Sequence, residues 1–307
     1  RCTQALSPRL STRPSSIQMG KTHPREYFVA GGIAGIVSRT AIAPIERVKI
    51  LYQVSRAAAG TQQGWMQIAP NILRDEGVLA FWKGNTAAVV RVMPYMSLTF
   101  LTYEEYKVRL IEGGMPKQAS TLAAGSAAGV TAVSVTYPLD LVRATMAKPG
   151  HTYSSMFDAM ITIVRQRGVG GLYAGISATI LGVAPYAGLK FVSYEGLKGV
   201  LGNFCGVSEA ELRPWQRVAS GLVAGMLAQT AVYPLDVVRR RMQMHEGAKG
   251  LYSSPLHALR TIAAEEGVRT GLFRGLTLNY LKTMPNVAIY MSLYDIVKMR
   301  LVTPSPA

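Results

Sequence analysis

Six long stretches of the chain consist mostly of apolar residues, and they come in pairs. The first members cover roughly 27–53, 122–147 and 217–244, and the second members roughly 86–110, 179–201 and 278–301. Each stretch holds about the 20 mostly apolar residues that an α-helix needs to cross a bilayer. The pattern therefore predicts an all-α membrane protein with six transmembrane helices.

Two of the links between paired helices carry apolar residues at helical spacing. They read YSSMFDAMITIVRQRG at 153–168 and YSSPLHALRTIAAEEG at 252–267. An apolar face on a short helix predicts an amphipathic helix lying on the membrane surface. A soluble helical solenoid is disfavoured, because the long stretches lack the charged outer face that such repeats show.

Charged side chains interrupt the long stretches at membrane depth. They are Arg39, Arg91, Lys190 and Lys282. A charge in a bilayer is costly unless it faces a bundle interior or water. The helices are therefore predicted to surround a wet cavity.

The chain repeats itself three times, with a period of about 95 residues. The clearest repeated segments are APIERVKILYQ at 43–53, YPLDLVRATMA at 137–147 and YPLDVVRRRMQ at 233–243. Each follows a pair of glycines four residues apart, a spacing that lets helix backbones approach closely in lipid. The repeats predict threefold pseudo-symmetry, with units at 26–115, 116–208 and 209–302, an arm at 1–25 and a tail at 303–307.

Each repeated segment carries an acid and a base three residues apart, on one helix face. Within one helix such a pair contributes only about 0.2–0.5 kcal/mol. Threefold symmetry offers an alternative, in which each acid pairs with the base of a neighbouring repeat and the pairs close a ring. The residues concerned are Glu46, Lys49, Asp140, Arg143, Asp236 and Arg239.

A second set of charges closes each repeat, in YEEYK at 103–107, YEGLK at 194–198 and YDIVK at 294–298. It offers a second ring at the other membrane face, and two rings on opposite sides of a cavity predict two gates that open alternately. The residues concerned are Tyr103, Glu104, Lys107, Tyr194, Glu195, Lys198, Tyr294, Asp295 and Lys298.

The charge composition narrows the class of protein. Only 16% of the residues are charged, against about 25% in soluble domains, yet the net charge is +16. This combination favours a membrane protein that meets anionic lipid or an anionic ligand. A nucleic-acid-binding protein is disfavoured, because the basic residues recur at the ends of apolar segments rather than on one polar face.

The sequence gives little support for a metal-binding protein or an enzyme. The first 25 residues are basic, rich in serine and free of acids, which predicts an organelle transit segment or a disordered arm. The two cysteines and four histidines show no metal-ligand spacing, so we expect neither a metal nor a cofactor. No nucleophile–base pair or phosphate loop is present, so an enzyme is not expected.

The triplicate motifs P-x-[DE]-x-x-[KR] and [FY][DE]-x-x-[KR] resemble those of the mitochondrial carrier family. EGVLAFWKG at 76–84, RGVGGLYAG at 167–175 and EGVRTGLFRG at 266–275 resemble a third family motif. The resemblance covers roughly residues 27–301. It implies a monomeric exchanger in the mitochondrial inner membrane, with one central substrate site, short helices on the matrix side and cardiolipin as a lipid partner.

The resemblance also implies roles for the charges. A matrix gate would pair Glu46 with Arg143, Asp140 with Arg239, and Asp236 with Lys49, and the second set would form a cytoplasmic gate. Gln53 and Gln243 match the glutamines that brace the matrix gate in the family. Ala147 stands at the third brace position, which implies a weaker gate than a fully braced one. No role follows for Arg240 and Arg241.

The predicted cavity residues indicate the substrate. Arg39, Arg91 and Lys282 favour an anion with several charges, and arginine suits phosphate. Gly182 and Val183, with Tyr186 a turn further on, offer a flat apolar patch for a purine. A glycine alone would more simply indicate helix packing, and only the three cations make nucleotide recognition the better interpretation.

The stretches RVMPYMSLTF and LGVAPYAGLKF are most similar to those of family members that carry coenzyme A. The similarity implies import of coenzyme A in exchange for ADP or adenosine 3′,5′-bisphosphate. The alternatives are another adenine-nucleotide carrier, exchanging ATP-Mg with phosphate or ADP with ATP, and a transport-dead receptor or scaffold. The ADP/ATP exchanger is disfavoured by RRRMQM at 239–244, and the receptor by the six intact matrix-gate charges.

Overall fold

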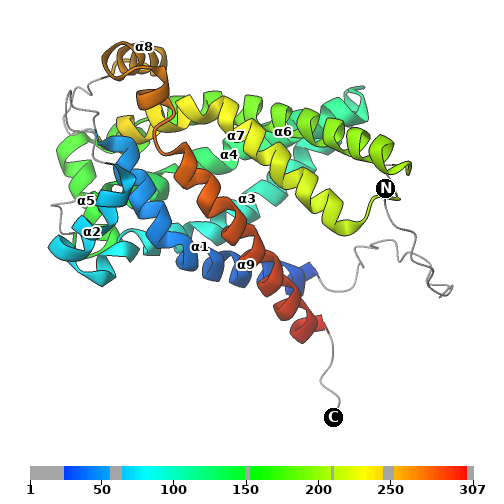
Figure 1. Ribbon diagram of the computed structural model, residues 1–307, viewed down its shortest axis with the longest axis horizontal. Coiled ribbons are helices and arrows are strands. Elements are labelled where there is room, and N and C mark those ends of the chain that lie inside the picture. Colours follow the sequence, from blue (N-terminus) through cyan, green and yellow to red (C-terminus); the bar gives the residue numbers. More distant parts are fainter. Residues whose placement is uncertain (1–23, 56–63, 149–152, 209–210, 245–251, 303–307) are drawn as a thin grey trace.

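The computed structural model describes residues 24–55, 64–148, 153–208, 211–244 and 252–302 (Figure 1). Nearly all of the expected arm and the expected tail lie outside the described residues. The long helices are α1 (Pro24–Val54), α3 (Asn85–Glu112), α4 (Lys117–Met146), α6 (Ile176–Cys205), α7 (Pro214–Met244) and α9 (Leu276–Val302). The short helices are α2 (Trp65–Glu76), α5 (Met156–Arg167) and α8 (Pro255–Glu266), each followed by a single turn, η1 (Val78–Trp82), η2 (Val169–Tyr173) or η4 (Val268–Leu272).

The described part of the chain is helical throughout and contains no strand, which confirms the predicted all-α fold. The six long helices fall where the apolar pattern placed them. Four described segments have the length and composition of membrane spans: Glu26–Val54, Lys117–Met146, Val169–Cys205 and Pro214–Met244. Helices α3 and α9, of 28 and 27 residues, are long enough to cross a bilayer but are not among these four segments.

Three helix pairs form the bundle: α1 packs along α9, α3 along α4, and α6 along α7. The first helix of each repeat presents a stripe of small residues, four apart, to its neighbours. The members are Ala30, Ala34 and Ser38 on α1, Ser120, Ala124, Ala128, Ala132 and Thr136 on α4, and Ser220, Ala224 and Ala228 on α7, all at most 2% exposed. Small side chains let backbones approach closely, as helices in lipid require.

The glycine pairs do not all serve that close packing. A Cβ at Gly35 would come within 3.1 Å of Val92 on α3, so the glycine there permits the contact. A Cβ at Gly125 or Gly225 would meet nothing within 4 Å. The expectation that all three pairs mediate close approach is therefore wrong for these two positions, where buried alanines one residue earlier make the contact instead.

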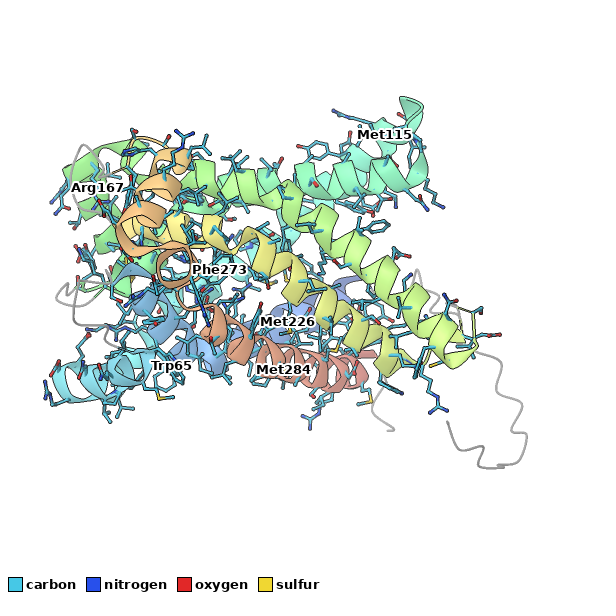
Figure 2. All side chains as sticks on the ribbon, turned by 45° about the horizontal axis from the view of Figure 1, so that its top comes forward. Trp65, Met115, Arg167, Met226, Phe273 and Met284 are labelled. Atoms are coloured by element: carbon cyan, nitrogen blue, oxygen red, sulfur yellow. The ribbon has the colours of Figure 1, made fainter. Side chains whose placement is uncertain are left out.

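The short helices lie together at one end of the bundle. Figure 2 shows Trp65, the first residue of α2, and Arg167, the last residue of α5, at one end of the bundle. Met115, between α3 and α4, lies at the other end. Ser155 and Ser254 cap α5 and α8 by accepting backbone N–H groups, which fixes where these helices begin. Their buried apolar faces turn to the bundle, so this end is called the short-helix end below.

A glycine begins the second helix of each repeat, and the structure shows why. Gly84, Gly175 and Gly275 have φ angles of 82°, 79° and 85°, which favour glycine. A Cβ at Gly84 would lie 2.7 Å from the Arg143 carbonyl oxygen, and one at Gly175 would lie 3.0 Å from that of Arg239. These glycines therefore let each repeat press against the next at the level of the repeated bases.

An ion cluster ties α2 to α1 in the first repeat. Arg47, whose side chain is 1% exposed, donates to both Glu76 oxygens at 2.9 Å, and Lys83 also pairs with Glu76. Burial acts to raise the pKa of the Glu76 carboxyl, but the hydrogen bonds from Lys83 and Arg47 outweigh it and the pKa lies below its ordinary value. The cluster therefore holds a carboxylate at neutral pH, and its stabilisation is lost as the pH falls through that lowered pKa.

We expect Glu76→Gln to destabilise the protein strongly, because it leaves the buried Arg47 guanidinium without its carboxylate. Removing one partner of a buried pair costs roughly 3 kcal/mol or more. Thermal unfolding of detergent-purified protein measures the effect. The neighbouring Asp75→Asn is the matched control, because among the described residues Asp75 pairs with exposed Arg74 and such surface pairs contribute little. Equal shifts in the two variants would contradict the cluster's role.

Candidate functional site

The six repeated charges meet where the long helices converge near the short-helix end. Each acid contacts the base of a neighbouring repeat: Arg143 lies 3.0 Å from Glu46, Lys49 lies 3.0 Å from Asp236, and Arg239 pairs with Asp140. The three pairs join repeat one to two, two to three and three to one. They are called the ion-pair ring below, and they link residues that lie between 97 and 187 positions apart in the sequence.

Two cavity cations also contact the ion-pair ring. Arg91 of α3 lies 3.3 Å from Asp140, and Lys282 of α9 lies 3.2 Å from Glu46. Each of these acids thus holds one base of a neighbouring repeat and one cation of the cavity. Lys49 is fixed in addition by donating to the Asn279 side-chain oxygen at 2.8 Å.

The two glutamines behave differently. Gln243 donates to Asp140 at 3.1 Å and to the Tyr137 hydroxyl at 3.0 Å, and its oxygen accepts from Arg240 at 2.9 Å. Gln53 donates to the Tyr233 hydroxyl at 3.0 Å, and its buried oxygen has no partner among the described residues. Only Gln243 touches a charge of the ion-pair ring.

Two tyrosines lie at the ion-pair ring that the sequence analysis did not predict there. Tyr137 and Tyr233 are fully buried, and their hydroxyls donate to the carbonyls of Ala174 and Arg274, directly before the glycines that begin α6 and α9. A signal was present, because both tyrosines directly precede the repeated proline, where the first repeat has Ala43. They anchor the second helix of a repeat to the first.

Arg240 and Arg241, for which the sequence gave no role, are 7% and 5% exposed. Arg240 bonds Gln243 and lies 3.7 Å from Asp140, so it adds positive charge beside the ion-pair ring. Arg241 pairs with Glu266 of α8 and donates to the Gln53 carbonyl at 3.1 Å. Arg241 therefore ties α8 to α7, as Arg47 ties α2 to α1.

A central cavity lies on the other side of the ion-pair ring and has three adjoining lobes. The first, about 240 Å³, lies among α3, α4, α6 and α7; the second, about 240 Å³, among α6, α7 and α9; the third, about 460 Å³, among α1, α3 and α9. The lobes share lining residues, since Tyr186 and Gln229 join the first to the second, Lys282 joins the second to the third, and Tyr95 joins the third to the first.

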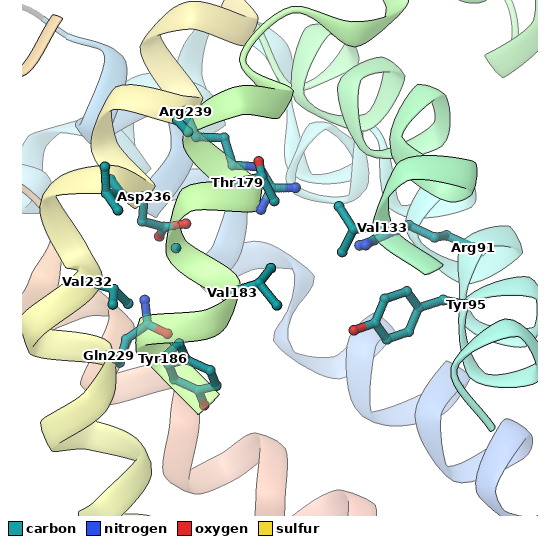
Figure 3. A pocket seen from close by; sticks show the side chains of 13 residues that line it. Arg91, Tyr95, Val133, Thr179, Val183, Tyr186, Gln229, Val232, Asp236 and Arg239 are labelled. Atoms are coloured by element: carbon teal, nitrogen blue, oxygen red, sulfur yellow. The ribbon is translucent and has the colours of Figure 1, made fainter. Parts of the chain in front are cut away.

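All six residues predicted to bind substrate line this cavity. Arg91, Gly182, Val183 and Tyr186 line the first lobe, and Arg39 and Lys282 line the third. Figure 3 shows Val183 and Tyr186 on one side of the first lobe, facing Arg91 and Tyr95 on the other. A Cβ at Gly182 would lie 3.8 Å from Leu235, an ordinary contact, so packing does not require a glycine there. The guanidinium of Arg39 makes no ion pair among the residues that the structure describes.

The second set of repeated charges lies at the opposite end of the bundle and forms no ring. Within the described residues, no ion pair joins one repeat to another there; Lys198 instead lies 2.8 Å from Glu195 in its own helix. Three lysines of the set lie over tyrosine rings, Lys107 over Tyr103, Lys198 over Tyr194 and Lys298 over Tyr27. Among the described residues, the ion pairs that join neighbouring repeats thus lie at the short-helix end.

Known proteins match the chain over almost its whole length. The sequence pattern described as mitochondrial carrier protein matches residues 20–114, 116–204 and 210–305. The chain belongs to the mitochondrial carrier family. The carrier is 42% identical over 280 residues to the mitochondrial coenzyme A transporter of Danio rerio, covering 89% of this chain and 86% of that one.

Two further relatives broaden the comparison. The human mitochondrial coenzyme A transporter is 40% identical over 296 residues, covering 94% of this chain and 92% of its own. The mitochondrial carrier protein CoAc2 of Zea mays is 42% identical over 303 residues, covering 91% and 87%. The carrier is therefore a multi-pass protein of the mitochondrial inner membrane, and its family consists of transporters rather than enzymes.

The contrast between the glutamines gives a test that needs no substrate. We expect Gln243→Ala to lower the midpoint of thermal unfolding by several degrees, because it removes one hydrogen bond from each of the charged groups of Arg240 and Asp140. A hydrogen bond to a charged group typically contributes about 1.5–3 kcal/mol. Gln53→Ala is the matched control, equally buried, and should shift the midpoint less. A larger loss in Gln53→Ala than in Gln243→Ala would contradict this account of the carrier.

Proposed function

We propose that the carrier imports coenzyme A into mitochondria in exchange for an adenine nucleotide, ADP or adenosine 3′,5′-bisphosphate. The observation that carries the proposal is the central cavity, where cations of α1, α3 and α9 surround a space with an apolar patch on α6. Relatives at about 40% identity, named coenzyme A transporters, support the same substrate.

The cavity suits the two chemically different halves of such a substrate. Arg39, Arg91 and Lys282 supply positive charge for phosphates, and arginine presents two parallel donors to a phosphate. Gly182 has no side chain, so a purine can lie flat against α6 beside Val183 and Tyr186. We place the adenine in the first lobe and the 5′-diphosphate among the three cations.

Binding and gating are coupled through shared charges. Arg91 and Lys282 pair with Asp140 and Glu46 of the ion-pair ring. A phosphate entering the cavity competes with these acids for the same two cations. The acids then hold their neighbouring repeats with fewer contacts, and the ion-pair ring is easier to open.

We infer alternating access from the two sets of repeated charges. In this conformation the ion-pair ring closes the short-helix end, which the family resemblance places in the matrix. Among the described residues, Glu104, Lys107, Asp295 and Lys298 of the second set form no ion pair between repeats, which fits an open cytoplasmic gate. Opening the ion-pair ring and pairing the second set would expose the substrate to the other side.

A monomer and an anionic lipid complete the proposal. The ion-pair ring closes within one chain, so a single copy contains every partner that the gate needs.

A separate cavity of about 290 Å³, lined by Trp65, Arg269 and Arg274 among others, lies outside the ion-pair ring at the short-helix end. We place the headgroup of an anionic lipid such as cardiolipin there, because two arginines meet an aromatic wall.

Exchange in proteoliposomes tests the proposed substrate. Vesicles loaded with ADP should take up labelled coenzyme A, whereas vesicles without internal nucleotide should not, because the proposed reaction is an exchange. External ATP, phosphate and amino acids are offered as competitors. Competition by ATP and phosphate alone would favour the alternative, an ATP-Mg/phosphate carrier. Failure to exchange any adenine-containing substrate would refute the proposal and leave a receptor or scaffold role.

The Arg91→Ala variant tests the proposed phosphate site in the same assay. It removes a phosphate ligand but leaves Asp140 paired with Arg239, so the protein should stay folded by thermal unfolding. Uptake should fall by about 10- to 100-fold, the usual value of hydrogen bonds to a charged group. Normal uptake by this variant would remove Arg91 from the site.

A charge reversal tests the ion-pair ring as a gate. Lys49→Asp and Asp236→Lys each place two like charges in contact, so each should lose most of the uptake. The double reversal restores an opposite pair at the same place and should recover a substantial part of it. Uptake in the double variant as low as in the single variants would show that this pair does not gate the carrier.

A further inference from the structure

Lys190 is a cation of the central cavity to which no role has been given so far. It lies on α6, four residues after Tyr186, and both side chains line the second lobe. An interval of eight residues places it about 12 Å from Gly182 along the helix axis. It therefore lies beyond the apolar patch, on the side away from the ion-pair ring.

The second lobe differs from the other two in charge. Asp236 lines the first lobe and Glu46 the third, but no carboxylate is among the residues that line the second. Its charged groups are Lys190 from α6 and Lys282 from α9, accompanied by hydrogen-bonding side chains of Gln229, Asn279, Tyr280 and Thr283. Since Lys190 has no carboxylate beside it among these lining residues, the lobe has a local excess of positive charge, which attracts an anion.

The two lysines also differ in the ion pairs that they form with other residues. Lys282 contacts Glu46 at 3.2 Å and lies on the boundary between the second and third lobes. Lys190 is exposed to the cavity, and the described residues give it no ion-pair partner. Its ammonium can therefore bind a ligand without first giving up a protein contact.

The glycines of α7 that line the second lobe with Lys190 leave space for such a ligand. Gly221 and Gly225 of α7 line the second lobe. A Cβ at Gly225 would meet nothing within 4 Å, so this glycine widens the lobe rather than packing a helix. The small-residue spacing of α7 thus has a different use in the third repeat than in the first, where Gly35 packs against Val92.

We propose that Lys190 and Lys282 bind a phosphate that the substrate carries in addition to its 5′-phosphate or 5′-diphosphate, and that Lys190 selects for a ribose 3′-phosphate. The inference rests on the proposed function. The 3′- and 5′-positions belong to one ribose, so phosphates on them lie close together. Lys282, shared by two lobes, has the diphosphate on one side and the 3′-phosphate on the other.

The chemical consequence is a preference between otherwise similar substrates. Coenzyme A and adenosine 3′,5′-bisphosphate carry the additional phosphate. Dephospho-coenzyme A and ADP do not, although both have the adenine and the diphosphate. A lysine that contacts only the additional phosphate changes the recognition of the first two and leaves the last two unaffected.

The test compares uptake of coenzyme A and dephospho-coenzyme A by ADP-loaded proteoliposomes. For Lys190→Ala we expect the KM for coenzyme A to rise about 10-fold or more, since bonds to charged groups are typically of that strength. The KM for dephospho-coenzyme A should stay within about 2-fold, which also shows that the variant is folded. Lys190→Arg should keep most of the preference, because it keeps the charge.

Lys117→Ala is the matched control, since it removes an exposed lysine at the start of α4, away from the cavity. Equal rises in KM for both substrates in Lys190→Ala would overturn the inference, and so would equal use of both by the unaltered carrier. An unaltered carrier that exchanges no adenine-containing substrate would instead refute the proposed function. The two failures are thus distinguished by the unaltered protein.

Discussion

Three ion pairs between neighbouring repeats hold the helices together at the short-helix end of the bundle, and the rest of the structure is arranged around them. Each links helices far apart in the sequence, so together they fix how the three repeats meet. A buried ion pair adds little net stability, because desolvation offsets the attraction, yet breaking it is costly. Such contacts hold one conformation specifically without making it very stable, as the proposed gate requires.

The contacts that support the ion-pair ring differ from repeat to repeat. The third repeat has Gln243 beside Asp140 and Arg241 paired with Glu266. In the first repeat, a different arginine, Arg47, pairs with Glu76, the residue that corresponds to Glu266. The second repeat has Ala147 in place of the glutamine and Arg167 in place of the glutamate, so it can form neither contact. A threefold architecture thus carries an asymmetric set of restraints, which suits a substrate that is itself asymmetric.

The cavity shows the same departure from symmetry. Its first and third lobes combine cations with an acid of the ion-pair ring, whereas its second lobe contains cations alone. Two of the cavity cations already pair with acids of the ion-pair ring, and Lys190 does not. The proposed substrate has phosphates at two positions of one ribose, and this uneven distribution of charge offers each a different environment.

The sequence alone determined the six long helices, the three repeats and the members of the ion-pair ring. Hydrophobic period and repeat spacing depend only on order along the chain, and threefold symmetry leaves few ways to pair six charges. It also identified the cavity cations Arg39, Arg91 and Lys282, because a charge at membrane depth must face the interior.

Only the tertiary structure decided which partner each group takes where several lie within reach. Helical spacing gives a residue its face but not the neighbour across from it. The sequence therefore could not show that Glu46 and Asp140 each hold a cavity cation, or that Arg240 and Arg241 are buried. Nor could it show that Gly35 packs a helix while Gly225 widens a cavity, since both have the same spacing and differ only in what the fold places opposite them.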